Sequence, residues 1–187
     1  MPAIGRLVSI ANVQHHMELR DAIATDFAQV LCLNAESEHF LSPLTLARLQ
    51  NLHAQAAYHR VAESGGAVCA FLLAVREGST YDSPNYQWFA QRFDRFLYID
   101  RIVVSGQQQG QGLGRLLYSD LFAFAGRTEA IRVTCEFDIE PPNENSRRFH
   151  QNYGFHEVGT QRAASGRKLV SLQAATLVPA GGVAHCG

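Results

Sequence analysis

The residues Tyr98-Ile-Asp-Arg-Ile-Val-Val104 open the stretch that decides the fold, which continues as Ser-Gly-Gln-Gln-Gln-Gly-Gln-Gly-Leu-Gly-Arg over 105–115 and Leu-Leu-Tyr-Ser-Asp-Leu-Phe-Ala-Phe over 116–124. The first part is β-branched and aromatic, which predicts a strand. The last part is apolar at helical period, with Leu117, Leu121 and Phe124 on one face. The glycines between them stand at a helix N-terminus, where unpaired amides bind anions, above all phosphates. The stretch therefore predicts a strand, an anion-binding turn and a helix.

The spacing of the glycines indicates which of the known phosphate-binding motifs this turn matches. A P-loop needs G-x-x-x-x-G-K followed by Ser or Thr, and no such Lys or hydroxyl follows here. A dinucleotide fingerprint needs a third glycine at position 115, which is Arg. What stands here is Gln109-x-x-Gly112-x-Gly114, which resembles the pyrophosphate-binding signature of the GNAT acyltransferases, a superfamily that binds acetyl-CoA. The alternative is an ordinary glycine turn before a helix.

A second motif lies downstream, as Pro141-Pro-Asn-Glu-Asn-Ser-Arg-Arg-Phe-His-Gln-Asn-Tyr-Gly-Phe155. It resembles the GNAT pattern N-x-x-[AS]-x-x-[FL]-Y-x-x-x-G-F, with matches at Asn143, Ser146, Phe149, Gly154 and Phe155. The residues are consistent with a strand, a helix and a stop, because the prolines end a strand, Asn143 suits an N-cap and Gly154 suits a left-handed residue after a helix. The departure is His150, where the family most often has tyrosine.

The resemblance implies an α/β (α+β) fold. This is a GNAT-like, mixed and mostly antiparallel central sheet of about seven strands, flanked by helices and splayed between its two central strands. It implies acetyl-CoA as cosubstrate. The cofactor-binding residues that it implies are Ile102, Val103, Val104, Gln109, Gly110, Gln111, Gly112, Leu113, Gly114, Arg115, Asn143, Ser146, Phe149 and His150.

Composition narrows the class of protein. A chain of 187 residues with 47% hydrophobic and 18% charged residues is expected to form a single domain, over 1–178, with a flexible tail over 179–187. A formal net charge of −1 gives no reason to expect a nucleic acid or a membrane as partner. Without an apolar run or a signal sequence, the expected location is cytoplasmic. The 4 cysteines lack C-x-x-C spacing, so reduced thiols and no metal are expected.

The flanking elements are assigned from periodicity and turn signals. Strands are expected at 7–13, 58–62, 68–77, 130–139, 157–161 and 168–172, with a turn at 164–166. Helices are expected over 20–35 and from Ser42-Pro43 onward, because Ser suits an N-cap and Pro the first helical position. The histidines other than His150 lack ligand spacing and are expected at the surface.

The connection over 78–95 is long and aromatic, and long ordered loops tend to be functional. We expect its aromatic residues and the adjoining strand to line an acceptor pocket, with Tyr81, Tyr86, Trp88 and Tyr98 as substrate-binding residues. The alternative is that these side chains cover a core edge or a dimer interface.

The candidate bases are the carboxylates on the two strands near the splay, Asp100, Glu136 and Asp138. Asp100 is expected to share a face with Tyr98 and Ile102. Burial disfavours the charged form of a carboxyl group and raises its pKa toward the range of a general base. The alternative is a structural ion pair, for example with Arg101 or Arg132. Sequence position does not choose among the three carboxylates.

The expected activity is transfer of an acetyl group from acetyl-CoA to an amine, on a small-molecule or peptide acceptor. The resemblance implies that His150 stands where tyrosine protonates the leaving thiolate; the alternative is that it packs beside Phe149. Because His150 replaces the tyrosine of the family, a CoA-binding sensor or degenerate acyltransferase without transfer activity is the alternative function. A protein that binds ATP or NAD is disfavoured by the glycine spacing. A homodimer is compatible with the resemblance.

Overall fold

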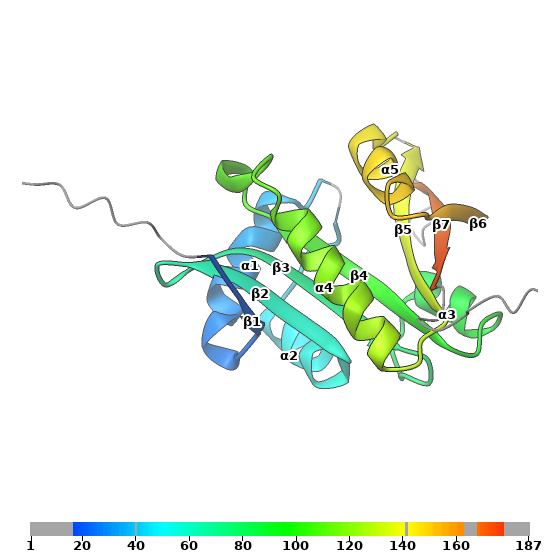
Figure 1. Cartoon of the computed structure of the whole chain (residues 1–187), viewed down its shortest axis with the longest axis horizontal. Helices are drawn as coiled ribbons and strands as arrows, with labels where there is room; N and C mark the ends of the chain where they lie inside the picture. The colour runs from blue at the N-terminus through cyan, green and yellow to red at the C-terminus, as the bar shows by residue number, and fades with distance from the viewer. Residues whose placement is uncertain (1–16, 40, 141, 163–167, 178–187) are drawn as a thin grey trace, which may run out of the picture.

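A computed structural model of the chain describes residues 17–39, 41–140, 142–162 and 168–177. The strand expected at 7–13, the turn at 164–166 and the tail at 179–187 lie outside these residues. The described elements form one central sheet with helices on both of its faces (Figure 1).

The sheet has seven strands in the order β1-β2-β3-β4-β5-β7-β6. They are β1 (Met17–Asp21), β2 (Tyr58–Ser64), β3 (Ala67–Arg76), β4 (Phe96–Val104), β5 (Arg132–Glu140), β6 (His156–Arg162) and β7 (Leu169–Thr176). Every neighbouring pair is antiparallel except β4 and β5, which run parallel. The mixed, mostly antiparallel sheet expected from the sequence is therefore confirmed.

The two central strands separate along their length, as Figure 1 shows. Their register covers only three pairs, which end at Tyr98 and Thr134. Beyond this point β4 continues along β3 to Val104, and β5 continues along β7 to Glu140. The expected splay is present, and it opens at the ends of β4 and β5 that lead into the two motifs.

The helices fall into two layers. They are α1 (Phe27–Glu36), α2 (Leu46–Gln55), α3 (Pro84–Ala90), α4 (Leu113–Arg127) and α5 (Glu144–Gln151), with 3-10 turns at Ala24–Asp26 and Gly106–Gln108. One core joins α1, α2 and α3 to the sheet through side chains such as Val30, Leu52 and Phe89. The other joins α4 to the opposite face through Leu117 and Leu121. The sheet is therefore covered on both faces (Figure 1).

Two expected helices begin later than the sequence indicated. Arg20 belongs to strand β1, where its guanidinium binds the Glu63 carboxylate of β2 at 2.6 Å, and the helix starts at Phe27. The second helix starts at Leu46 rather than at Ser42-Pro43, because Thr45 supplies the N-cap by accepting a hydrogen bond from the amide of Arg48 at 3.2 Å. In both cases a tertiary or capping contact overrides the local signal.

The long connection, where the sequence predicts an ordered loop, contains a helix of its own, α3. Ser83 caps it by accepting from the amide of Tyr86, and Pro84 occupies its first turn. Tyr86 and Phe89 are buried in the core between α3 and the sheet. This segment therefore covers a core edge.

Candidate active site

The glycine turn joins β4 to α4 and leaves several backbone amides unpaired. Gly112 is the N-cap of α4 in the left-handed conformation, with φ of 86°, and a Cβ there would meet nothing within 4 Å. The amide of Leu116 bonds back to the carbonyl of Gly112 at 3.0 Å. Within the described chain, the preceding amides of 113–115 have no acceptor, as at any helix N-terminus. The turn can therefore offer N–H groups and open space to an anion.

Helix α5 lies next to this turn. Asn143 is its N-cap and accepts from the amide of Ser146 at 3.1 Å, and Gly154 follows the helix with φ of 76°. A Cβ on Gly114 would stand 3.4 Å from the Phe149 ring, so a glycine at this position lets α4 and α5 approach closely. The two motifs, far apart in sequence, are thus neighbours beside the splay.

His150 is buried, and both of its ring nitrogens have partners. Nδ1 lies 2.7 Å from the carbonyl oxygen of Ser146, which can only accept, so Nδ1 carries the proton. Nε2 then accepts from the hydroxyl of Tyr118 at 2.8 Å. Burial lowers the pKa of His150, which favours the neutral form of the ring. In this arrangement both ring nitrogens are engaged and no N–H is left for a leaving thiolate, and the ring packs edge-on to Phe149.

Glu136 lies in the half of β5 that has left β4, on the face toward α3. Its Oε1 accepts hydrogen bonds from Asn85 Nδ2 at 2.8 Å and from the Tyr98 hydroxyl at 3.0 Å. Its Oε2 is buried and has no hydrogen-bond partner among the described residues. Burial raises the pKa of Glu136 to about 7, even though both donors favour the charged form. A carboxylate with this pKa is suited to accept a proton near neutral pH.

Asp100 has the environment of a structural ion pair. Its side chain is 4% exposed and binds Arg101 Nε at 2.6 Å and the hydroxyl of Tyr81. The pairing of β3 with β4 shifts register here, from Leu73 opposite Arg101 to Ala74 opposite Ile99, so Asp100 is the extra residue of a bulge. This bulge changes the expected alternation, because Tyr98 and Ile102 contribute to different cores.

Asp138 is also paired. Its side chain is 8% exposed and accepts from Lys168 Nζ of the neighbouring strand region at 2.7 Å. The expected alternative partner of Glu136, Arg132, lies over the ring of Phe93 instead, at 4.6 Å from its centroid. Of the three carboxylates, Glu136 is therefore the one without a cationic partner in the described part of the chain.

The aromatic residues of the expected acceptor pocket lie close to these carboxylates. The rings of Tyr81 and Tyr86 are each within 6.3 Å of the Tyr98 ring, and burial raises the pKa of Tyr81 and of Tyr98. Tyr86 donates to the carbonyl of Arg76, so its hydroxyl serves the fold. Trp88 points the other way, onto Gly159 of β6.

Two further residues belong to this region although no sequence motif contains them, Asn85 on α3 and Gln161 on β6. Gln161 Nε2 donates to Asn85 Oδ1 at 3.1 Å, and Asn85 in turn donates to Glu136. The Ser83-Pro84 pair could have indicated the start of α3. No sequence signal connects Asn85 to a residue on β5.

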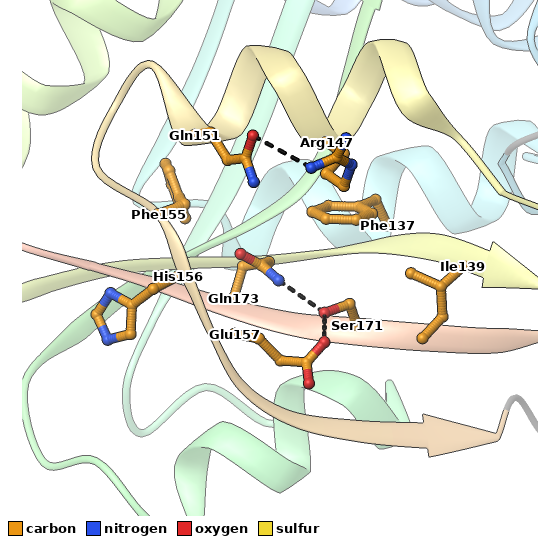
Figure 2. A pocket seen from close by; sticks show the side chains of 9 residues that line it. All are labelled: Phe137, Ile139, Arg147, Gln151, Phe155, His156, Glu157, Ser171 and Gln173. Carbon is orange, nitrogen blue, oxygen red and sulfur yellow. Dashed lines mark hydrogen bonds between the residues drawn. The ribbon is translucent and has the colours of Figure 1, made fainter.

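A cavity of about 320 Å³ lies on the opposite face of β5, under α5. Figure 2 shows Arg147 and Gln151 of α5 on one side of it and strand residues such as Phe137 on the other. Its floor holds a chain of hydrogen bonds, in which Gln173 donates to Ser171 and Ser171 donates to Glu157 (Figure 2). Because alternate strand residues face opposite sides, this cavity is separate from Glu136.

Four further observations on the described residues concern metal ligands, cysteines, a histidine and membrane-spanning helices. No three His, Cys, Asp or Glu side chains in the described ranges come together as a metal site. Cys69 and Cys135 are buried free thiols, as expected. His59 is buried rather than exposed, which corrects the surface position expected for it. In the same ranges, no helix is long and apolar enough to cross a membrane.

The chain is similar to known proteins in both sequence and structure. The model of the Acetyltransferase (GNAT) family matches residues 20–155. Among curated proteins, a phosphinothricin N-acetyltransferase of Streptomyces coelicolor is 42% identical over 68 residues. That match spans 36% of this chain and only 38% of the length of the relative.

The fold has solved counterparts. The structure of Ard1 from Thermoplasma volcanium aligns with a TM-score of 0.72 at 15% identity, over 87% of this chain and 98% of that one. The structure of yncA, a putative acetyltransferase from Salmonella typhimurium with its cofactor acetyl-CoA, aligns with a TM-score of 0.66 at 19% identity, over 91% of this chain and 99% of that one. At such identities the likeness establishes the fold alone.

Proposed function

The chain belongs to the Acetyltransferase (GNAT) family, whose members are acetyl-CoA-dependent N-acetyltransferases, and from this premise we propose that it acetylates a small-molecule amine with Glu136 as general base. The observation that carries the proposal is the environment of the Glu136 carboxyl group, which raises its pKa and gives it no cationic partner among the described residues. The residue is half-buried beside the splay, its pKa is raised to about 7, and its buried Oε2 has no partner in the described residues. A structural carboxylate at this depth is expected to have a cationic partner, as Asp100 and Asp138 do.

The residues around the splay suit the cosubstrate. The unpaired amides of 113–115 would hold the diphosphate of CoA, with Gly110 and Gly112 leaving open space before them. The edge of β4 at Ile102–Val104, which faces away from β3 after the strands part, would bind the pantetheine arm. Asn143 and α5 would close the other side. When bound, acetyl-CoA supplies the activated acetyl group.

The chain's own residues would then handle the proton of the acceptor. An amine reaches the site as an ammonium ion, and ionised Glu136 removes one proton through Oε2. The neutral nitrogen forms a bond to the thioester carbonyl carbon, and the carbon–sulfur bond breaks. The nitrogen gives up a second proton, which balances the one that the thiolate gains. Because a thiol has a pKa near 8.5, this departure needs little help from an acid, in line with the engagement of His150 elsewhere.

The class of acceptor is proposed from two arguments. The relative from Streptomyces coelicolor is named for acetylation of phosphinothricin, a small molecule, although the match covers a minor part of both chains. The aromatic side chains of Tyr81 and Tyr98 stand on the face of β4 that Glu136 also faces, where an acceptor with an apolar portion would bind. A peptide amine is the competing class.

The test is consumption of acetyl-CoA against a library of small amines and short peptides. With an active acceptor, Glu136→Gln should lower kcat by about 100-fold or more while the affinity for acetyl-CoA changes little. Glu140→Gln is the matched control, since Glu140 is exposed on the same strand. Wild-type rates in Glu136→Gln would overturn the base assignment. Binding of acetyl-CoA without turnover of any amine would favour the sensor alternative.

Self-association stays a prediction. The expected homodimer would be detected by light scattering of the full chain at micromolar concentration, and a monomer there would contradict it.

A further inference from the structure

We infer that Asn85 and Gln161 are positioning residues, which together fix the orientation of the Glu136 carboxylate so that Oε2 stays the oxygen without a hydrogen-bond donor. The inference rests on the proposed role of Glu136 as base. It assigns a purpose to α3 and to the edge strand β6, which hold these two side chains and lie outside both sequence motifs.

The hydrogen bonds define one orientation for each group. Gln161 donates from Nε2 to Asn85 Oδ1 at 3.1 Å, so the oxygen of the Asn85 amide points to β6. Its NH₂ group must then point the opposite way, where Nδ2 donates to Glu136 Oε1 at 2.8 Å. Tyr98 donates to the same Oε1 at 3.0 Å. Two donors on Oε1 leave Oε2 as the oxygen that takes up the proton.

The arrangement is braced by packing between α3 and β6. The ring of Trp88, three residues after Asn85, lies against Gly159, two residues before Gln161. A Cβ at position 159 would stand 2.6 Å from Trp88 Cζ2, so only glycine permits this contact without displacement. The main chains that carry Asn85 and Gln161 are therefore held at a fixed separation, which is the condition for a reproducible hydrogen bond.

Loss of either residue should change the ionisation of Glu136 in a defined direction. A donor to the charged form of a carboxyl group lowers its pKa, so removing Asn85 Nδ2 should raise the pKa of Glu136 above its value of about 7. A charge-assisted hydrogen bond is worth enough to move this pKa upward by about one. Below that pKa, the ionised fraction and kcat should fall by about tenfold.

Gln161→Glu provides a sharper test than simple truncation. A carboxylate at 161 accepts hydrogen bonds only, so the Asn85 amide should turn to donate to it. The oxygen of Asn85 would then face Glu136, and a donor would be replaced by an acceptor. The rise in the pKa of Glu136 should exceed that in Gln161→Ala.

The experiment is a carbon-13 NMR titration of glutamate carboxyl groups in the full chain without ligand, with the Glu136 signal identified by its loss in Glu136→Gln. We expect the pKa of Glu136 to rise in Asn85→Ala and Gln161→Glu and to stay unchanged in Gln87→Ala, an exposed residue of the same helix. The acidic limb of the pH–kcat profile should move by the same amount, with little change in KM.

The outcomes separate the two proposals. If Asn85→Ala and Gln161→Glu fold but leave the pKa of Glu136 unmoved, the inference is overturned, whatever Glu136→Gln does to turnover. If the pKa moves while Glu136→Gln keeps its rate, the hydrogen-bond relay holds and the base assignment fails. Gln161 is half-buried on an edge strand, so its variants should fold even if Asn85→Ala does not.

Discussion

Asn85 Nδ2 and Glu136 Oε1 lie 2.8 Å apart, although 51 positions separate the two residues in the chain. The contact connects the segment between β3 and β4 to the strand on the far side of the splay. The hydrogen bond ends on Oε1 of Glu136. The other carboxylate oxygen, Oε2, is buried and has no partner in the described chain, and it is the oxygen proposed to accept the proton. The geometry makes the raised pKa of Glu136 the most testable property of the site.

The contribution of Glu136 to stability should fall as pH rises from its unfolded to its folded pKa, and comparison with Glu136→Gln isolates it from the opposite contribution of His59. In the unfolded chain Glu136 has a pKa of 4.5, and in the folded protein about 7, so between these values only the folded state holds the proton. Above pH 7 the loss should reach about 3 kcal/mol. Glu136→Gln should therefore be more stable than the wild type at alkaline pH and similar to it near pH 4.5. Urea unfolding of both proteins at the two pH values measures this. If the difference in free energy of unfolding between Glu136→Gln and the wild type is the same at both, the prediction is wrong.

His59 should impose the opposite dependence in acid. Burial, with a contribution from the neighbouring His53, lowers its pKa from 6.5 to about 4, and its Nε2 has no partner in the described residues. Between these values only the unfolded chain takes up the proton, so the contribution of His59 to stability should drop by about 3 kcal/mol as pH falls through them. His59→Phe should flatten this part of the pH–stability curve, while His156→Phe, on an exposed residue, should leave it as in the wild type.

Gly112→Asp should weaken binding of acetyl-CoA through charge. The residue has φ of 86°, so any replacement carries backbone strain. Gly112→Asn is the matched control, because Asn has the same size and the same tolerance of this conformation without the charge. Calorimetric titration should give an affinity at least about tenfold lower for Asp than for Asn, since a carboxylate repels the diphosphate. Equal affinities would place the diphosphate away from this turn.

Asp100→Asn should act on stability, since the residue is engaged in a buried ion pair with Arg101. Removing one partner leaves the guanidinium without its countercharge in a site where both side chains are under 10% exposed. The free energy of unfolding should fall by about 3 kcal/mol. Asp21→Asn is the control, because Asp21 pairs with Arg60 at the surface with an 80% exposed side chain and should change stability by less than about 0.5 kcal/mol. Equal effects of the two variants would contradict the assignment.

Gly159→Ala should strain the contact between β6 and α3. Its Cβ would overlap the Trp88 ring, at a cost of about 2 kcal/mol in the free energy of unfolding. The same substitution in a Trp88→Leu background should cost clearly less, because the ring is gone. Chemical denaturation of the four proteins of this double-mutant cycle measures the coupling, and additive effects would show that the contact is unimportant.

Local patterns predicted the parts of the site whose chemistry lies in the backbone. The glycine spacing around Gly112 and the capping residue Asn143 indicated a helix N-terminus with free amides and a second helix beside it, and the structure has both. The strands expected at 58–62 and 68–77 are likewise present, as the antiparallel pair β2 and β3. These features depend on residues close in sequence, which is why periodicity and turn chemistry reveal them.

The remaining features depend on partners that sequence distance conceals. Arg20 looked helical, yet its bond to Glu63 keeps it in a strand. His59 is buried in the folded protein, although no pattern in the neighbouring sequence indicates a buried histidine.

What the sequence by itself determined is the order of elements and the glycine turn at the N-terminus of α4, because turn residues and helix periods are local properties of the chain. Which of the three carboxylates lacks a cationic partner was decided only by the tertiary structure. Asp100, Glu136 and Asp138 are chemically alike, and two of them meet a cation while the third does not. A pKa is set by burial and by the charges nearby, and both come from residues that folding brings together.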